Sequence, residues 1–173
     1  EHTGFLRDAL AADNLEEARR HAEHVVNILA GAESERFKDW DDNGLAENPG
    51  DGVGVRAYLQ QTNEQIEAAI ESGSLSAKQA QNGTRAITYS QNTQAALDGT
   101  IDKALQIFAT DSMGEAEPMI EELSVLVDEL FSGSDQDGNG VIDPIRGEGG
   151  ISAAIDFTIL MAEMDIFAVE SRD

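Results

Sequence analysis

Residues 39–52 read DWDDNGLAENPGDG, and residues 135–149 read DQDGNGVIDPIRGEG. Both stretches combine clustered carboxylates and amides with glycine and proline, which punctuate helices and favour turns. No helix is expected to run through either of them. The chain is therefore expected to consist of helices joined by at least two long acidic loops.

Helical periodicity covers most of the chain outside these two loops, because apolar residues recur there at every third or fourth position. Asn14 is well placed to cap a helix that ends at Gly31, since Glu17 follows it at the third helical position. No stretch has the sustained alternation of a strand. The sequence predicts an all-α fold, an antiparallel helical bundle that forms a single domain over residues 1–173.

Each acidic loop lies between two helical patterns, which predicts a helix–loop–helix unit used twice. The units cover about residues 14–72 and 113–170, and the last helix is expected to run from Ile151 to Val169. Residues 75–110, rich in Gln, Ala, Thr and Asn, are predicted to form a polar helical connector, either one helix or two helices broken near Asn82-Gly83. The two loops are thus interpreted as parts of an internal repeat.

Both loops contain the pattern D-x-D-x-N-G-x-x-[DE], which predicts one Ca²⁺ ion in each. Oxygens at positions 1, 3 and 5 converge as the chain curls around a cation, and the glycine at position 6 allows the left-handed turn. Position 7 contributes a backbone carbonyl, and position 9 a further carboxylate. The predicted ligands are Asp39, Asp41, Asn43, Leu45 (carbonyl) and Glu47 in the first loop, and Asp135, Asp137, Asn139, Val141 (carbonyl) and Asp143 in the second.

Over these nine positions the loops resemble the calcium loops of EF-hand and dockerin proteins. An EF-hand ends with a bidentate glutamate at position 12, where this chain has Gly50 and Arg146. An acid flanked by glycines follows soon after in both loops. Asp51 and Glu148 are therefore predicted to be displaced last ligands.

A second resemblance covers roughly residues 5–60. The helix that carries HAEHVVN at residues 21–27, followed by the first acidic loop and NPGDG at residues 48–52, is similar to secreted bacterial helical proteins. The resemblance implies an extracytoplasmic location, whether secreted, periplasmic or at the cell surface.

Charge and composition exclude several classes of function. The chain has 34 acidic and 11 basic residues, a formal net charge of −23, which disfavours binding to nucleic acids and to anionic membranes. It has no cysteine, so it has no thiolate metal site and no cysteine nucleophile. No apolar run is long enough to span a bilayer. No nucleophile elbow or phosphate-binding glycine loop occurs, so the protein is not expected to be an enzyme.

His21 and His24 lie three residues apart, on one face of the predicted second helix. The preferred interpretation is a hydrogen-bonding pair that fixes this helix next to Asn27. The alternative is a haem-binding or metal-binding helical bundle that uses the two histidines.

The first hypothesis for function is an extracytoplasmic structural or protein-interaction domain in which calcium stabilises the loops between helices. Its partner is either another protein or a second copy of the chain. The alternatives are a cytosolic calcium sensor or buffer, and the haem or metal protein based on His21 and His24.

Overall fold

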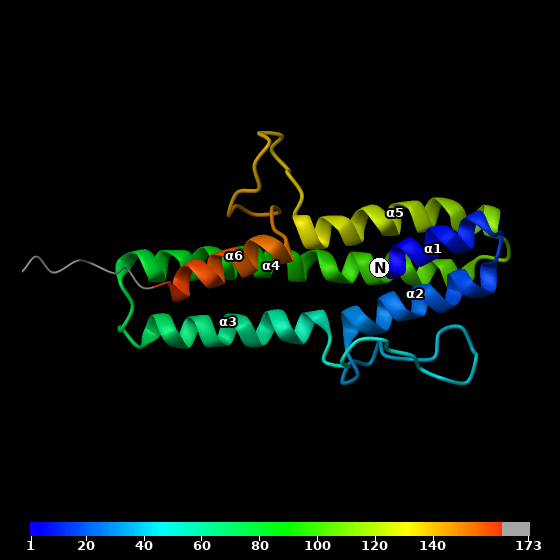
Figure 1. Ribbon diagram of the computed structural model, residues 1–173, viewed down its shortest axis with the longest axis horizontal. Helices are drawn as coiled ribbons and strands as arrows, with labels where there is room; N and C mark the ends of the chain where they lie inside the picture. Colours follow the sequence, from blue (N-terminus) through cyan, green and yellow to red (C-terminus); the bar gives the residue numbers. More distant parts are fainter. Residues whose placement is uncertain (164–173) are drawn as a thin grey trace, which may run out of the picture.

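The computed structural model describes residues 1–163, and within them it contains six α-helices, one short 3-10 helix and no strand. This confirms the predicted all-α helical bundle (Figure 1). The elements are α1 (His2–Ala11), α2 (Leu15–Ala30), α3 (Val55–Glu71), α4 (Ala77–Gln106), η1 (Ile107–Ala109), α5 (Met113–Ser132) and α6 (Ile151–Ala162).

Local side-chain hydrogen bonds set the beginnings of three helices. The Asn14 side chain accepts a hydrogen bond from the Glu17 amide at the start of α2, as predicted from the sequence. Ser76 and Gln79 form a reciprocal capping box at the start of α4, and Ser112 caps α5. These caps satisfy amides that would have no partner inside their own helix.

The predicted polar connector is a single unbroken helix, α4, and it packs against α2, α3, α5 and α6. Two of its buried polar side chains keep their hydrogen bonds, because Thr93 and Thr100 donate to the carbonyls of Tyr89 and Ala96, one turn earlier. Gly83 continues the helix where other helices approach closely: a Cβ there would lie 3.0 Å from Ile66 Cγ2. The absence of a side chain at Gly83 therefore lets α3 and α6 pack closely against α4.

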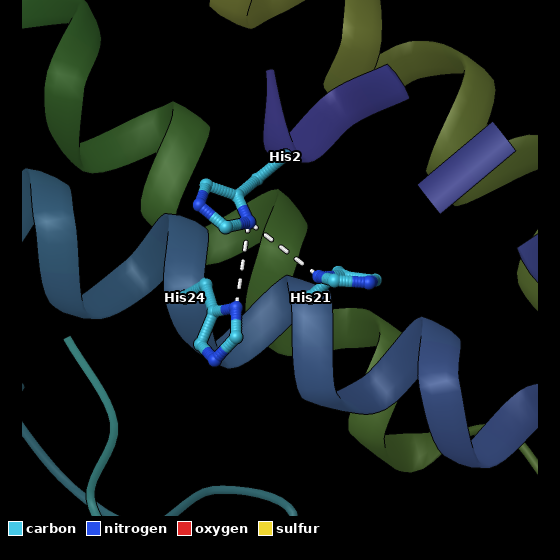
Figure 2. Close-up of side chains that lie close together, drawn as sticks. All are labelled: His2, His21 and His24. Carbon is cyan, nitrogen blue, oxygen red and sulfur yellow. Dashed lines mark hydrogen bonds between the residues drawn. The ribbon is translucent and has the colours of Figure 1, made fainter. Parts of the chain in front are cut away.

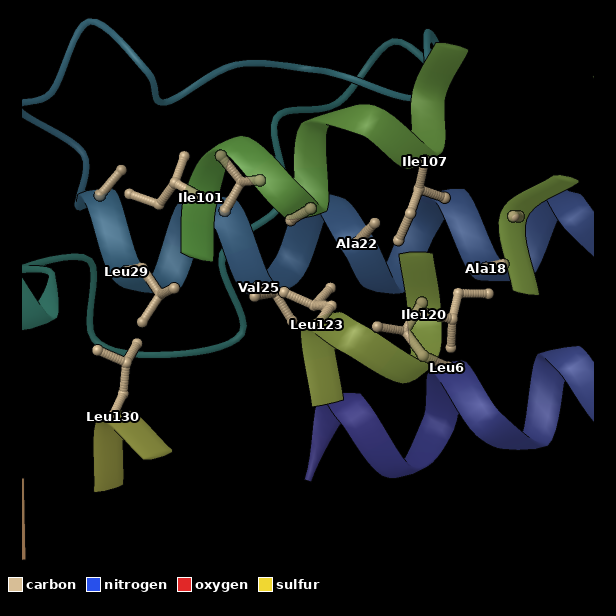
Figure 3. Packing of buried hydrophobic residues seen from close by; sticks show 14 of the residues in the cluster. Leu6, Ala18, Ala22, Val25, Leu29, Ile101, Ile107, Ile120, Leu123 and Leu130 are labelled. Carbon is tan, nitrogen blue, oxygen red and sulfur yellow. The ribbon is translucent and has the colours of Figure 1, made fainter. Parts of the chain in front are cut away.

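The larger part of the core joins α1, α2, α4 and α5 (Figure 3). A smaller apolar cluster joins α3, α4 and α6 around Ile66, Ala86 and Met161. Phe131 at the end of α5 lies outside the core, because its side chain is 61% exposed. The larger cluster fixes α1 on α2, which matters for the histidines described below.

The described part of α6 ends at Ala162, so the predicted extension to Val169 lies outside the described residues. Within residues 1–163 no helix has the length and apolar character needed to cross a membrane. The antiparallel order of the helices and the internal repeat stay predictions.

Candidate metal centres

The two acidic segments form the long connections of the bundle. The first joins α2 to α3, and the second joins α5 to α6 and stands out from the helices in Figure 1. We call residues 39–51 loop 1 and residues 135–148 loop 2. Position 1 is Asp39 in loop 1 and Asp135 in loop 2.

The backbones of the two loops turn at the same positions. Position 4 is left-handed in both, with φ 59° at Asp42 and 73° at Gly138. Position 6 also has a positive φ, 95° at Gly44 and 85° at Gly140. This conformation suits glycine, because it has no Cβ to clash, and Asp is among the few other residues that tolerate it.

The first acid of each loop binds the amides of the turn that follows it. In loop 1, the Asp39 carboxylate accepts from the amides of Asn43 and Gly44. In loop 2, the Asp135 carboxylate accepts from the amides of Asn139 and Gly140. These hydrogen bonds curl the two segments in the same way and hold their carboxylates close together.

The aspartate at position 3 and the asparagine at position 5 also make equivalent hydrogen bonds in the two loops. Asp41 accepts from the Asn43 amide, and Asp137 from the Asn139 amide. The Asn43 and Asn139 side chains in turn accept from the amides at position 7, which belong to Leu45 and Val141.

Glu148 closes loop 2 from inside the protein, where its side chain is fully buried. One carboxylate oxygen accepts from the amides of Gln136 and Asp137, both at 3.1 Å, and the other accepts from the Asp143 amide at 2.7 Å. Carboxylate oxygens of Asp135, Asp137 and Glu148 lie within 4.8 Å of one another. The structure thus brings together three of the acids that the sequence predicted for this loop.

Glu23 of α2 has the same contacts in loop 1. One of its oxygens accepts from the Trp40 amide at 2.6 Å and the Asp41 amide at 3.2 Å, and the other accepts from the Glu47 amide at 2.7 Å. These amides occupy positions 2, 3 and 9, as do the three amides that Glu148 binds. Glu23 is also fully buried and groups with Asp39 and Asp41.

This arrangement places Glu23, and not Asp51, beside Asp39 and Asp41, so the role of Asp51 as last ligand of loop 1 stays a prediction. The exposed Asp51 carboxylate accepts from the Tyr58 hydroxyl and the Val53 amide, and it does not belong to the group formed by Glu23, Asp39 and Asp41. The sequence does contain a signal for Glu23, since an acid there lies beside the apolar face of an amphipathic helix.

The two loops differ at position 9. In loop 2 the Asp143 carboxylate accepts from the Asn139 side chain, within the loop. In loop 1 the Glu47 carboxylate instead contacts Arg20 Nε at 3.1 Å and His24 Nε2 at 3.3 Å. The hydrogen bond from Arg20 lowers the pKa of Glu47 and keeps this carboxylate ionised. Loop 1 therefore has one carboxylate fewer turned toward its acidic group.

Asparagines of two helices, the buried Asn27 and the half-buried Asn92, attach the loops to the bundle. Asn27 of α2 donates to the carbonyls of Lys38 and Glu47 in loop 1. Asn92 of α4 donates to the carbonyls of Ile145 and Glu148 in loop 2. Each loop is thus tied to a helix near its buried glutamate.

In loop 2 the backbone amides also change the pKa of an aspartate. Hydrogen bonds from the backbone, led by the one from Gly140, lower the pKa of Asp135. This carboxylate is therefore ionised at neutral pH, with oxygens available to a hard cation.

A second group of possible metal ligands, which consists of histidines, lies beside Glu47. His21 and His24 of α2 meet His2 of α1, and the three imidazoles turn their Nδ1 atoms toward one another (Figure 2). The sequence indicated the first two but not His2, because nothing in the local pattern places α1 across this face of α2.

The chain matches no known protein family, no curated protein and no solved structure.

Proposed function

We propose that loops 1 and 2 each bind one Ca²⁺ ion, and that calcium stabilises the joints between helices in an extracytoplasmic structural or protein-interaction domain. The proposed ligands are Asp39, Asp41, Asn43, the carbonyl of Leu45 and Glu23 in loop 1, and Asp135, Asp137, Asn139, the carbonyl of Val141, Asp143 and Glu148 in loop 2.

The observation that carries this proposal is the recurrence of one closing arrangement. A fully buried glutamate holds the amides at positions 2, 3 and 9 in both loops, although it comes from the preceding helix in one case and from the loop exit in the other. The two loops are thus closed by equivalent hydrogen bonds, although they differ at position 9. The match also supports the interpretation of the two helix–loop–helix units as a repeat.

The donors favour calcium over magnesium. Five or six hard oxygens from an irregular loop suit Ca²⁺, which accepts 6–8 oxygen ligands, whereas Mg²⁺ requires a tighter octahedron and keeps its waters. With Gly50 and Arg146 at position 12, the sites lack the bidentate glutamate of sensor loops. We therefore propose affinities near the ~10⁻⁴–10⁻³ M of extracellular modules, which fill where calcium is millimolar. A cytosolic sensor or buffer would require tighter sites, so that alternative is not favoured.

The test is a thermal melt of the full chain in chelator and then in millimolar calcium. Calcium at ten times Kd, which is about 1–10 mM for the proposed affinities, contributes about 1.4 kcal/mol per site. Two such sites are therefore expected to raise Tm by ~6–11 °C, since about 1 kcal/mol corresponds to ~2–4 °C at this size.

Asp39→Ala and Asp135→Ala are each expected to remove about half of this shift, whereas the exposed Asp51→Asn is expected to retain it. Magnesium should replace calcium poorly. Superimposed melting curves with and without calcium would contradict the proposal.

A further inference from the structure

All three histidines of the chain lie in one cluster. His2 begins α1, and His21 and His24 lie on the facing side of α2, so the packing of α1 on α2 creates the cluster (Figure 2). One nitrogen from each ring lies within 4.8 Å of the other two. We call this group the histidine cluster.

The two distances from His2 to the other histidines match those between ligands of one metal ion. His2 Nδ1 lies 3.4 Å from His21 Nδ1 and 3.4 Å from His24 Nδ1. Zinc–imidazole bonds of ~2.0–2.1 Å at tetrahedral angles place neighbouring ligand nitrogens ~3.3–3.4 Å apart. The same distances are long for hydrogen bonds, in which a nitrogen donor usually lies ~2.7–3.2 Å from its acceptor.

The protons available to the ring nitrogens also argue against a cluster that is held by hydrogen bonds alone. A ring nitrogen carries either a proton or a lone pair, so His2 Nδ1 either shares one proton between two acceptors or offers one lone pair to two donors. Neither arrangement satisfies all three nitrogens well. One cation at the centre would satisfy all three at once.

Two of the rings have a carboxylate near Nε2, the nitrogen that faces away from the cluster, as metal-bound histidines commonly do. His24 Nε2 lies 3.3 Å from Glu47 Oε2, and His21 Nε2 lies 3.6 Å from Glu17 Oε2. A carboxylate that accepts a hydrogen bond from the far nitrogen, as Glu47 does from His24, selects the tautomer with a free Nδ1 lone pair and raises the basicity of the ligand. Glu17 lies close enough to His21 to favour the same tautomer by its charge. The Phe5 ring, whose centroid is 5.0 Å from that of His21, gives the cluster an apolar cover.

We propose that His2, His21 and His24 bind one divalent transition-metal ion of the zinc and copper class through their Nδ1 atoms. Imidazole is a preferred ligand of these ions, whereas Ca²⁺ selects oxygen, so this site is chemically distinct from loops 1 and 2. Three protein ligands leave a fourth position for water or an exogenous ligand.

The experiment titrates Zn²⁺ into the full chain in millimolar calcium, by calorimetry and by competition with a chromophoric chelator. One zinc ion per chain is expected. His2→Ala and His21→Ala should each weaken zinc binding about tenfold or more, and Glu17→Gln, which removes a positioning carboxylate, by about tenfold. Co²⁺ in place of zinc should show the intense visible absorption of a four-coordinate site, and His2→Ala should abolish it.

His2 is half-buried in the first turn of α1, so its substitution leaves the core intact, which a melt in calcium can check. Asp51→Asn and Asp39→Ala serve as controls that should retain zinc binding, and the second separates this site from the calcium proposal. The proposal is overturned by an absence of saturable zinc binding, or by an affinity that is the same in His2→Ala, His21→Ala and the unaltered chain.

Discussion

At the residue scale, the buried glutamates organise the two acidic loops. A carboxylate in the interior loses its hydration, which costs several kcal/mol unless hydrogen bonds replace the water. Glu23 and Glu148 each accept three amide hydrogen bonds, and hydrogen bonds to charged groups contribute ~1.5–3 kcal/mol each. A carboxylate has about four lone-pair positions, so Glu148 keeps one for a cation. In Glu23 the fourth position accepts a long hydrogen bond of 3.4 Å from Asn27 Nδ2, which a cation would have to displace.

Glu23→Gln and Glu148→Gln test this role. Each change replaces an accepting oxygen with an NH₂ group that faces backbone amides, so the free energy of unfolding should fall by about 1–3 kcal/mol. Each should also weaken calcium binding in its own loop and spare the other. Trp40, the single tryptophan, lies at position 2 of loop 1, so its fluorescence should report the loss in Glu23→Gln and not in Glu148→Gln.

Asp51→Asn is the matched control for this pair, since it makes the same acid-to-amide change outside the acidic group. It should leave calcium affinity unaltered. If Asp51→Asn weakened the Trp40 response as much as Glu23→Gln did, the assignment of Glu23 to loop 1 would be incorrect.

At the element scale, glycines determine how the helices enter and leave the loops. Helices α2 and α5 both end at a glycine with positive φ, 82° at Gly31 and 94° at Gly133. Both helices that follow also begin after a glycine, at Gly54 and Gly150. In each unit the two glycines meet: a Cβ on Gly54 would lie 2.6 Å from Gly31 Cα, and a Cβ on Gly150 would overlap the Gly133 amide. Bare backbone is therefore required where each loop closes on itself.

Gly31→Ala is expected to destabilise the fold by about 2 kcal/mol or more, because it combines backbone strain with overlap on Val53 and Gly54. Gly99→Ala is the control, since Gly99 lies inside α4 with open space around it and alanine is there favoured by about 0.5–1 kcal/mol. Chemical denaturation measures both. Equal effects of the two substitutions would contradict the close approach at Gly31.

At the scale of the whole molecule, a net charge of −23 makes self-repulsion a general cost of folding. The acidic residues gather most densely in loops 1 and 2, which project from the bundle or lie along it (Figure 1). Cations should therefore act at two levels, by general screening and by binding in the loops.

We expect NaCl to raise the Tm of the calcium-free protein, because the screening length falls from ~30 Å at 0.01 M to ~3 Å at 1 M salt. Each kcal/mol of repulsion relieved should raise Tm by ~2–4 °C. The calcium-saturated protein should show a smaller rise, since bound ions already neutralise the densest clusters. A Tm that falls with NaCl in both states would show that attractive ion pairs outweigh the repulsion.

The sequence by itself determined the features that depend on neighbours along the chain. The all-α class, the cap formed by Asn14 and the end of α2 at Gly31 follow from helical spacing and capping, which act within a few residues. The turns of both acidic loops are local for the same reason: side chains at positions 1, 3 and 5 bind amides two to five residues ahead.

Only the tertiary structure decided which distant groups lie beside the loops. Glu23 contacts loop 1 because the start of this loop folds back along α2, and Glu47 contacts His24 because that helix presents Arg20 and His24 beside it. His2 joined His21 because the apolar faces of α1 and α2 pack together. Periodicity predicts which face of a helix is buried, but not which residue of another helix that burial places opposite it.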